Sequence, residues 1–381
     1  MPVIGVLKET AAGETRVALV PQNVTQLVRD KHTVIIQSGA GERAGVSDKE
    51  YTQAGARVVA SANVVCKTAN LIVKVQAPAP AEVKRLKKGT MLISFLSPSA
   101  NGAVIKSLAG RGVTAFAMEY IPRISRAQSM DALSSMATVA GYRSVLIAAT
   151  TVGKMYPLLM TAAGTVPPAT VFILGAGVAG LQAIATAKRL GARVEAFDPR
   201  PAVKEQVKSL GASFVEMELP KEDVETTGGY AKEQSEAFLK AERVAIAARL
   251  SKVNALITTA QIFGKKAPVL VTAEMVKKMP AGAVIVDLAA ESGGNCELTV
   301  AGKTVVKHGI TIIGAVNLPA QVPIDASQMF SRNVFNLLKH MYPKADAPTD
   351  AAEEILAASC LTRGGSIVHD AVRAMLGKGG R

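Results

Sequence analysis

Tryptophan is absent from this chain of 381 residues, and aromatic side chains make up only 4% of it. Proteins that bind single-stranded nucleic acid or carbohydrate stack bases and sugars on such rings, so we expect no surface of this kind and no nucleic-acid partner. The three cysteines, Cys66, Cys296 and Cys360, lie far apart and form no CxxC pair. This spacing argues against a clustered zinc or iron–sulfur site, and we expect no metal. A sparse, odd cysteine count is typical of a reducing compartment.

Two membrane-targeting features are also missing. The first ten residues lack a basic segment followed by a long apolar run, so we expect no signal peptide. Residues 155–187 carry no charge, but prolines and glycines interrupt them repeatedly. A membrane-spanning helix needs about 20 continuous apolar residues. The stretch therefore predicts two short apolar elements separated by turns.

Acidic residues are outnumbered, with 30 Asp and Glu against 44 Lys and Arg, for a formal net charge of +14. The basic residues are spread along the chain, with the densest runs at 84–88 and 277–278. Solvated helix faces explain this distribution, and a surface that attracts an anionic membrane or nucleotides is the alternative. With 49% hydrophobic and 19% charged residues, the chain is expected to fold rather than remain disordered.

Short β-branched segments alternate with helical patterns in the first third of the chain. Helices are predicted at 21–31 and 48–54, the second with Ser47 as its N-cap. The predicted strands are 2–8, 33–37, 58–59, 71–75, 91–95 and 114–118. Strand–helix alternation favours a mostly parallel sheet that is covered on both faces.

A long helical pattern at 129–151 leads into a second run of this kind. Residues 325–340 are helical again and 367–368 predict a strand, so we expect the last segment to pack on the first domain. The strands predicted for the second run are 170–174, 194–197, 255–258, 283–287 and 311–313. The pattern predicts an α/β fold of two Rossmann-like domains, with parallel sheets flanking a cleft and long helices joining them. The expected domains are 1–137 plus 319–381, which is discontinuous, and 138–318.

The sequence Gly-Ala-Gly-Val-Ala-Gly, which begins at Gly175, follows a predicted apolar strand and precedes an alanine-rich helix. In that context a GxGxxG pattern indicates a dinucleotide-binding turn. Gly175 permits the tight turn, Gly177 lets the backbone approach a pyrophosphate, and Gly180 lets helix and strand pack closely. Backbone amides at the start of the helix, including Val178 and Ala179, would hold the anion.

Asp198 ends the next predicted strand, 23 residues after Gly175. A carboxylate at about this distance accepts hydrogen bonds from the ribose hydroxyls and repels a 2′-phosphate. We therefore predict that the domain 138–318 binds NAD(H) rather than NADP(H). Arg200 lies nearby and can accommodate a 2′-phosphate, which keeps the alternative open. No second fingerprint occurs in the sequence, so the chain supplies one dinucleotide site.

Three segments resemble the NAD(H)-binding component of proton-translocating nicotinamide nucleotide transhydrogenase. They are 123–135 (RISRAQSMDALSS), 160–169, which leads into the glycine turn, and 226–233 (TTGGYAKE). The first is highly specific to that family, and the similarity extends over nearly the whole chain, from Lys8 to His369. It implies direct hydride transfer between NAD(H) on this chain and NADP(H) on a partner component. A membrane-spanning component would couple the transfer to proton translocation.

The same resemblance implies a homodimer on the cytoplasmic side of the inner membrane, as a peripheral component, or on the matrix side in a mitochondrion. It also implies that Arg123, Gln128 and Asp131 position NAD(H) and meet the partner's nucleotide. Arg123 can anchor a phosphate or carboxamide oxygen, and Gln128 can both donate and accept toward the second ribose. Asp131 can orient Arg123, and Ser134 can hold the nicotinamide carboxamide. For Arg123 and Asp131, the alternative is an ordinary ion pair at the start of a helix.

Two further segments receive roles from the resemblance. Tyr230 would cap the bound nucleotide as a lid, with Gly229 in its hinge, and an ordinary exposed loop tyrosine is the alternative. Ala260 and Gln261 follow the predicted strand 255–258 and should lie by the nicotinamide-side ribose. The family often has an apolar residue where Gln261 stands.

Alanine dehydrogenase has a similar fold and is the second possible function. In that family an Arg, a Lys and a His serve the amino-acid site; Arg16 and Lys74 stand at matching positions, but the His position falls at Leu96–Ser97. Oxidation of an amino acid needs a proton acceptor beside the hydride site. Transfer between two nicotinamides needs only two rings held at near-attack distance with water excluded. The missing histidine therefore favours the transhydrogenase, with Arg16 and Lys74 as structural groups around the cleft. A non-catalytic NAD-binding protein is the third possibility.

Overall fold

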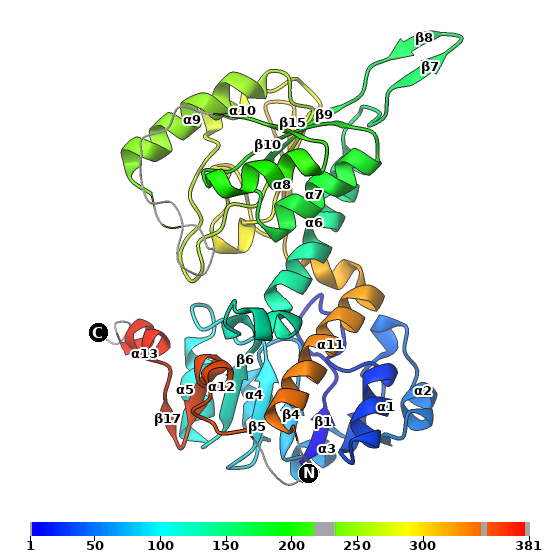
Figure 1. Cartoon of the computed structure of the whole chain (residues 1–381), viewed down its shortest axis with the longest axis vertical. Helices are drawn as coiled ribbons and strands as arrows, with labels where there is room; N and C mark the ends of the chain where they lie inside the picture. The colour runs from blue at the N-terminus through cyan, green and yellow to red at the C-terminus, as the bar shows by residue number, and fades with distance from the viewer. Residues whose placement is uncertain (1, 217–231, 233, 344–348, 378–381) are drawn as a thin grey trace. The chain divides into compact units, whose positions relative to one another are not determined.

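The computed structural model of the protein describes residues 2–216, 232, 234–343 and 349–377. It divides into two compact units, each with its own sheet. Unit 1 consists of residues 1–136 and 320–381, and unit 2 of residues 137–319. Helix α6 (Ala132–Thr151) contains the point in the chain at which one unit gives way to the other (Figure 1).

The sheet of unit 1 has eight strands in the order β17-β16-β6-β5-β4-β1-β2-β3. Its six N-terminal strands pair in parallel, as the alternation of strands and helices predicted. The strands are β1 (Val3–Val6), β2 (Thr33–Gln37), β3 (Arg57–Val59), β4 (Leu71–Val73), β5 (Met91–Ser94), β6 (Thr114–Ala117), β16 (Cys360–Arg363) and β17 (Ser366–Ile367). β16 was not predicted, and it pairs antiparallel with both β6 and β17. The fold class is confirmed, with an antiparallel edge added to the sheet.

The helix Asp48–Gln53 of unit 1 begins at the N-cap that the sequence predicted. Ser47 accepts a hydrogen bond from the Glu50 amide, and the Glu50 side chain accepts from Ser47 in return, so the predicted N-cap is confirmed as a capping box. The helices are α1 (Pro21–Arg29), α2 (Asp48–Gln53), α3 (Ala62–Thr68), α4 (Pro80–Val83), α5 (Gly102–Gly110), α11 (Pro323–Met341), α12 (Glu354–Ser359) and α13 (Asp370–Gly377).

α11 is tied to the N-terminal part of unit 1 by buried serines. The Ser327 and Ser331 hydroxyls accept from the amides of Val17 and Val20, each at 3.0 Å. Because these side chains satisfy backbone groups that the sheet leaves unpaired, the C-terminal segment completes the unit rather than standing apart.

The sheet of unit 2 has seven strands in the order β11-β10-β9-β12-β13-β15-β14, all parallel except the edge strand β14. The strands are β9 (Thr170–Leu174), β10 (Arg193–Phe197), β11 (Ser213–Phe214), β12 (Ala255–Thr258), β13 (Val284–Asp287), β14 (Thr304–Lys307) and β15 (Ile310–Gly314). All five predicted strands are confirmed to within one residue. The helices are α7 (Val178–Arg189), α8 (Lys204–Ser209), α9 (Glu236–Leu250) and α10 (Ala273–Val276).

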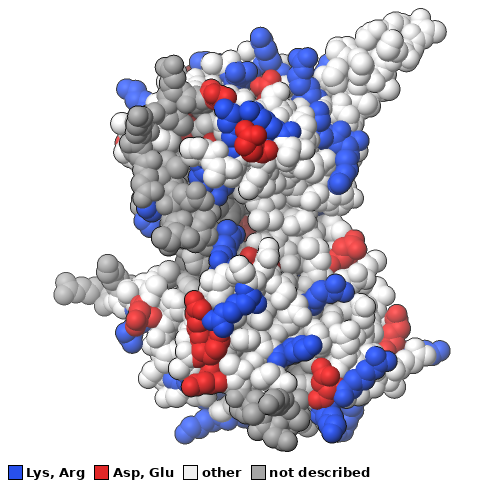
Figure 2. Space-filling model, viewed as in Figure 1, with Lys and Arg blue, Asp and Glu red and all other residues white. Residues whose placement is uncertain are grey.

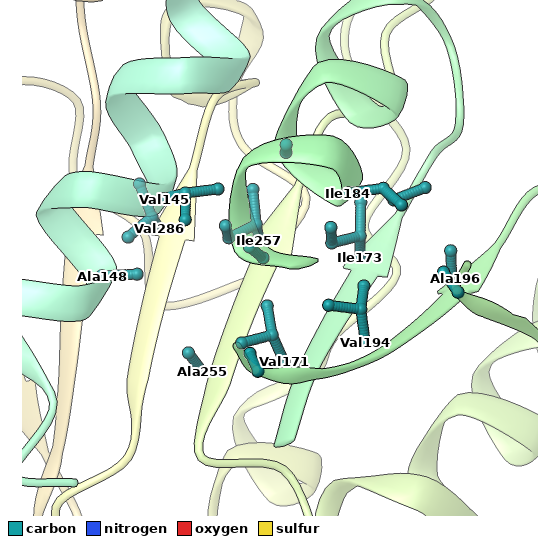
Figure 3. Close-up of a cluster of buried hydrophobic side chains, with 14 of the residues drawn as sticks. Val145, Ala148, Val171, Ile173, Ile184, Val194, Ala196, Ala255, Ile257 and Val286 are labelled. Carbon is teal, nitrogen blue, oxygen red and sulfur yellow. The ribbon is translucent and has the colours of Figure 1, made fainter. Parts of the chain in front are cut away.

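Alternate residues of β9 face opposite sides of this sheet and enter two separate cores. Val171 and Ile173 pack with α6 and α7, as Figure 3 shows, whereas Phe172 and Leu174 pack on the side of α9 and α10. Gly141 lies in the middle of α6, where a Cβ would come within 2.1 Å of the Ala179 carbonyl oxygen of α7. The glycine that interrupts the helical pattern thus allows the two helices to approach closely.

The uncharged stretch 155–187 is broken into separate elements, as predicted. A two-stranded hairpin, β7 (Leu159–Thr161) and β8 (Gly164–Val166), precedes β9 and α7. One described helix, α6, is long and apolar enough to cross a membrane by length and composition, and 39% of its apolar window is buried. Val145 and Ala148 of α6 belong to the core of unit 2, which accounts for its apolar character.

Basic side chains are distributed over the surface. On the face drawn in Figure 2, Lys and Arg side chains occur on both units, interspersed with Asp and Glu. This arrangement fits the interpretation of the +14 charge as solvated side chains on that face.

Candidate functional site

The β9–α7 turn contains all three glycines of the GxGxxG sequence. Gly175 has φ +93°, and a Cβ there would lie 2.7 Å from Thr259 Oγ1. A Cβ on Gly180 would lie 1.9 Å from the Gly175 carbonyl oxygen. A Cβ on Gly177 would have Arg200 Nη2, 3.9 Å away, as its nearest atom among the described residues outside the adjoining ones. The fold itself therefore requires Gly175 and Gly180, whereas the described residues leave space beside Gly177.

Helix α7 presents its N-terminus at this open space. Its N-cap is Gly177, which has no side chain to bond the first amides, and its first residues Val178 and Ala179 are half-buried. Uncapped amides and the positive end of the helix dipole suit an anion such as a pyrophosphate. The residues that surround the turn thus fit the phosphates of a dinucleotide.

Asp198 directly follows β10, beside the turn, and is 5% exposed. Its Oδ2 accepts from the Ala176 amide at 2.7 Å and from Arg200 Nη2 at 2.8 Å. Its Oδ1 accepts from Arg200 Nε at 2.8 Å and from the Arg200 amide at 3.0 Å. A carboxylate has about four acceptor positions, so a ribose hydroxyl would compete with Arg200 for Asp198. The role of Asp198 toward ribose stays a prediction. For a ribose hydroxyl to bond Asp198, the Arg200 side chain would have to give up at least one of its hydrogen bonds to that carboxylate.

Glu242 of α9 is a candidate that the sequence analysis missed. Its side chain is 2% exposed, and its Oε2 has no hydrogen-bond partner among the described residues. Burial and the negative charge of Asp198 raise the pKa of Glu242 to about 7, and the charge of Arg243 opposes the shift. The sequence signal was available: Glu242 stands between Phe238 and Ile246, at helical spacing on an otherwise buried apolar face.

Ala260 and Gln261 lie directly after β12, and the Ala260 amide nitrogen is 3.2 Å from where a Gly175 Cβ would stand. Asn295 holds Ala260 on both sides: its Oδ1 accepts from the Ala260 amide at 3.0 Å, and its Nδ2 donates to the Ala260 carbonyl at 2.8 Å. The exposed Gln261 side chain donates to the Leu288 carbonyl. The structure therefore brings Ala260 to the glycine turn, and Asn295, which the sequence analysis missed, fixes it there.

Asp287, at the end of β13, supports this arrangement from below the surface. It is fully buried and accepts hydrogen bonds from the amides of Ala289, Asn295 and Cys296 and from the Thr299 hydroxyl. Its oxygens are occupied within the protein, so Asp287 orders the loop that carries Asn295.

The segment 123–135 lies entirely in unit 1. Arg123 Nε lies 4.0 Å from Asp131 Oδ2, and Asp131 accepts from both the amide (2.8 Å) and the hydroxyl (2.6 Å) of Ser134. Asp131 thus caps the N-terminus of α6 and also faces Arg123. This arrangement agrees with the alternative interpretation, an ordinary ion pair at the start of a helix. Gln128 is exposed, so its side chain is accessible.

Two neighbours hold this segment in place. The Ser129 carbonyl accepts from Asn333 Nδ2 at 2.9 Å and from Asn336 Nδ2 at 3.0 Å, both on α11. Arg126 pairs with Glu353 at 2.7 Å and with Glu354. The loop that carries Gln128 is therefore anchored on both sides of that residue.

Arg16 and Lys74 are buried and already paired. Arg16 forms two hydrogen bonds with Glu14, at 2.7 and 2.6 Å. Burial opposes ionisation of Glu14, but the hydrogen bonds and charge of Arg16 prevail and lower its pKa to about 2. Lys74 lies 3.3 Å from Glu9 and 3.0 Å from Glu82. Internal carboxylates thus neutralise both cations, as expected for structural groups.

At 96–97, where the alanine dehydrogenase histidine would fall, the backbone amides of Leu96 and Ser97 donate to Glu119 at 2.9 and 2.6 Å. Glu119 is itself buried, and that burial raises its pKa.

Tyr230 and Gly229 lie outside the described residues. Among the residues that are described, no group of three His, Cys, Asp or Glu side chains is placed to hold a metal ion.

Comparison with known proteins assigns this architecture to a family. The model of the alanine dehydrogenase/PNT N-terminal domain matches residues 5–140, and that of the C-terminal domain matches residues 144–370. The chain belongs to the alanine dehydrogenase/PNT family. The membership predicted from its sequence is therefore confirmed.

Both branches of the family are represented among its relatives. The first part of the NAD(P) transhydrogenase alpha subunit of Rhodospirillum rubrum is 47% identical, over 97% of this chain and 98% of the relative. A solved transhydrogenase from Sinorhizobium meliloti is 41% identical with a TM-score of 0.85, over 97% of this chain and 99% of that one. A solved L-alanine dehydrogenase is 30% identical with a TM-score of 0.83, over 98% and 99%. The fold is common to both branches, so the function must be argued from the site.

Proposed function

We propose that this chain is the NAD(H)-binding component of a proton-translocating transhydrogenase. Hydride would pass directly between NAD(H) on this chain and NADP(H) on a partner component, and a membrane-spanning component would couple the transfer to proton movement. The family membership and the name of the Rhodospirillum rubrum relative support an oxidoreductase of this kind.

The observation that carries the proposal is the chemistry at Leu96–Ser97. This position presents backbone amides bonded to Glu119, and no imidazole that could take a proton from an amino acid. A direct exchange between two nicotinamides has no such requirement, because the hydride moves without a protein acid or base. What it requires is positioning and the exclusion of water.

Several of the predicted residues then have a part in binding or positioning. The α7 N-terminus beside Gly177 would bind the pyrophosphate, and Asp198 the adenosine ribose once Arg200 yields. The nicotinamide supplies the site at which hydride is gained or lost. Exposed Gln128 would bridge to the second nucleotide, while Asp131 orients Arg123 and Ser134.

A homodimer is part of the proposal, and the β7–β8 hairpin offers a surface for it. Met155, Leu158, Met160 and Val166 in and beside the hairpin are 57%, 54%, 79% and 37% exposed, and the segment carries no charge. Exposed apolar side chains in one place favour a protein contact. A second copy of the chain is the occupant we propose.

An alanine dehydrogenase remains the second candidate, because Arg16 and Lys74 are present and a solved L-alanine dehydrogenase shares the fold. The decisive experiment has two arms. In one, the purified chain is mixed with an NADP(H)-binding transhydrogenase component and reduction of an NAD analogue by NADPH is followed. In the other, the chain alone receives L-alanine and NAD. We expect turnover in the first arm only; turnover of alanine by the chain alone would contradict the proposal.

A further inference from the structure

We propose that Asn295 is a positioning residue for the nicotinamide half of the dinucleotide, which it serves by holding the backbone of Ala260 in place. The inference rests on the proposed function, in that NAD(H) binds at the β9–α7 turn. It assigns to Asn295 an effect on one half of the nucleotide, whereas the glycine turn serves the pyrophosphate between the two halves.

The order of the strands indicates which half of the nucleotide lies near Ala260. From β9, the chain adds β10 and β11 on one side and then returns to add β12 and β13 on the other. In a parallel sheet of this kind, a dinucleotide lies across the carboxyl ends of the strands at the point of reversal. With the pyrophosphate at the turn after β9 and the adenosine toward Asp198 after β10, the nicotinamide half extends over the end of β12. Ala260 lies there, because β12 ends at Thr258.

Ala260 lies just beyond the last bond that joins β12 to β9. The Thr259 amide donates to the Leu174 carbonyl at 2.8 Å, and the Thr259 hydroxyl donates to the Gly175 carbonyl at 3.1 Å. Within the part of the chain that the structure describes, the Ala260 backbone bonds instead to the Asn295 side chain, which accepts from its amide and donates to its carbonyl. Loss of Asn295 would therefore release Ala260, whereas Thr259 would still hold the glycine turn.

The Asn295 side chain is itself held in one orientation. It is fully buried, and its Nδ2 donates to the Pro268 carbonyl as well as to the Ala260 carbonyl, each at 2.8 Å. A side-chain amide has one end that donates and one that accepts, so a flipped amide would break all three bonds. The Asn295 backbone amide also donates to Asp287 Oδ2 at 2.8 Å. An apolar side chain of this size would leave three backbone groups without these bonds, so packing alone does not explain Asn295.

The test compares the full chain with Asn295→Ser, whose side chain is too short to bond both backbone groups of Ala260. Dissociation constants for NADH and ADP are measured by isothermal titration calorimetry, because ADP carries the adenosine and the diphosphate but no nicotinamide. We expect NADH affinity to fall about 5- to 10-fold, the equivalent of one hydrogen bond of ordinary strength. ADP affinity should change by less than about twofold. A merely structural role would weaken both ligands together, since both bind at the same sheet.

Asn254→Ser is the matched control, because Asn254 makes the same kind of bond at the opposite end of the same two strands. Its Oδ1 accepts from the Thr170 amide, at the start of β9, at 2.9 Å. We expect this variant to lose thermal stability without a change in the ratio of the two dissociation constants.

Asn295→Asp is the second variant, should the Ser form fail to fold. It keeps the volume of the side chain and an acceptor for the Ala260 amide but cannot donate to two carbonyls, so the ratio should shift in the same direction. An unchanged ratio, or an equal weakening of both ligands, would overturn the inference while the unaltered chain still binds NADH. Failure of the unaltered chain to bind NADH would instead count against the proposed function.

Discussion

Gly180 and Gly177 of the β9–α7 turn have different surroundings. Substitution of Gly180 should therefore affect folding, and substitution of Gly177 should affect nucleotide binding. A Cβ on Gly180 would overlap the Gly175 carbonyl, whereas one on Gly177 would meet no described atom closer than 3.9 Å. The sequence motif alone does not distinguish the two positions.

We therefore predict that Gly180→Ala lowers the melting temperature and NADH affinity together. Gly177→Ala should keep the melting temperature within about 2 °C, because exposed or open positions cost little stability, but weaken NADH binding by filling the space for the pyrophosphate. Thermal denaturation and fluorescence titration check both variants. If Gly177→Ala bound NADH normally, the result would show that the pyrophosphate does not bind at this turn.

Gln128 is exposed on a loop that is held at Ser129 and Arg126. Shortening it to Asn withdraws its amide by one methylene without disturbing those anchors. We expect Gln128→Asn to slow single-turnover hydride transfer to the partner component by about 10- to 100-fold, the usual effect of a displacement near 1 Å. NADH affinity should change by less than about twofold, a limit equivalent to about 0.4 kcal/mol.

Ser125→Ala, an exposed change in the same segment, is the control for Gln128→Asn. Equal losses in transfer rate and NADH affinity would count against the proposed position of Gln128 between the two nucleotides.

At the scale of elements, exposed apolar side chains gather in and beside the hairpin β7–β8 among the described residues of unit 2. We predict that Met160→Lys converts a dimer into a monomer, because a charge would have to be buried in the contact. Light scattering during gel filtration measures the mass directly.

Val244→Lys is the matched control: Val244 is also apolar and 67% exposed, but lies on α9. A Met160→Lys protein that keeps the mass of the unaltered chain would show that the hairpin is not the contact.

At the scale of the whole molecule, Glu242 links stability to pH. The pKa of Glu242 is about 7 in the folded protein against the ordinary glutamate value of 4.5, so between these values the folded state binds a proton that the unfolded state has released. The free energy of unfolding therefore decreases as pH rises through that window, by on the order of 3 kcal/mol in all. Glu14 acts in the opposite direction: it stabilises above about pH 4.5, and that contribution is lost as the pH falls toward 2.

We predict that Glu242→Gln raises the urea midpoint at pH 8 relative to the unaltered chain and has a much smaller effect at pH 5. Glu14 is present in both proteins, so its contribution cancels from this comparison at each pH. Such a gain would show that the ionised Glu242 carboxylate destabilises the folded chain. A loss of stability at both pH values would mean that Glu242 has an ordinary structural role.

Much of each unit could be predicted because the signals are local. Runs such as Thr170–Leu174 and Ala255–Thr258 are short, apolar and bounded by turn residues, and both are strands over those residues. β16 was not predicted because Cys360–Arg363 follows α12 without a turn signal, and its pairing with β6 joins residues about 245 positions apart. Only the antiparallel ladder that forms in the folded unit makes it a strand.

The alternation of strands and helices, the glycine turn and the acid that follows β10 could be predicted from the sequence, because a few neighbouring side chains and backbone angles govern each of these. Only the folded units show that Arg200 is bonded to Asp198, that Asn295 holds Ala260, and that Glu242 is buried with its Oε2 unpartnered among the described residues. Hydrogen bonds, desolvation and charge interactions depend on distances in space, and these arise only when segments remote in the chain pack together.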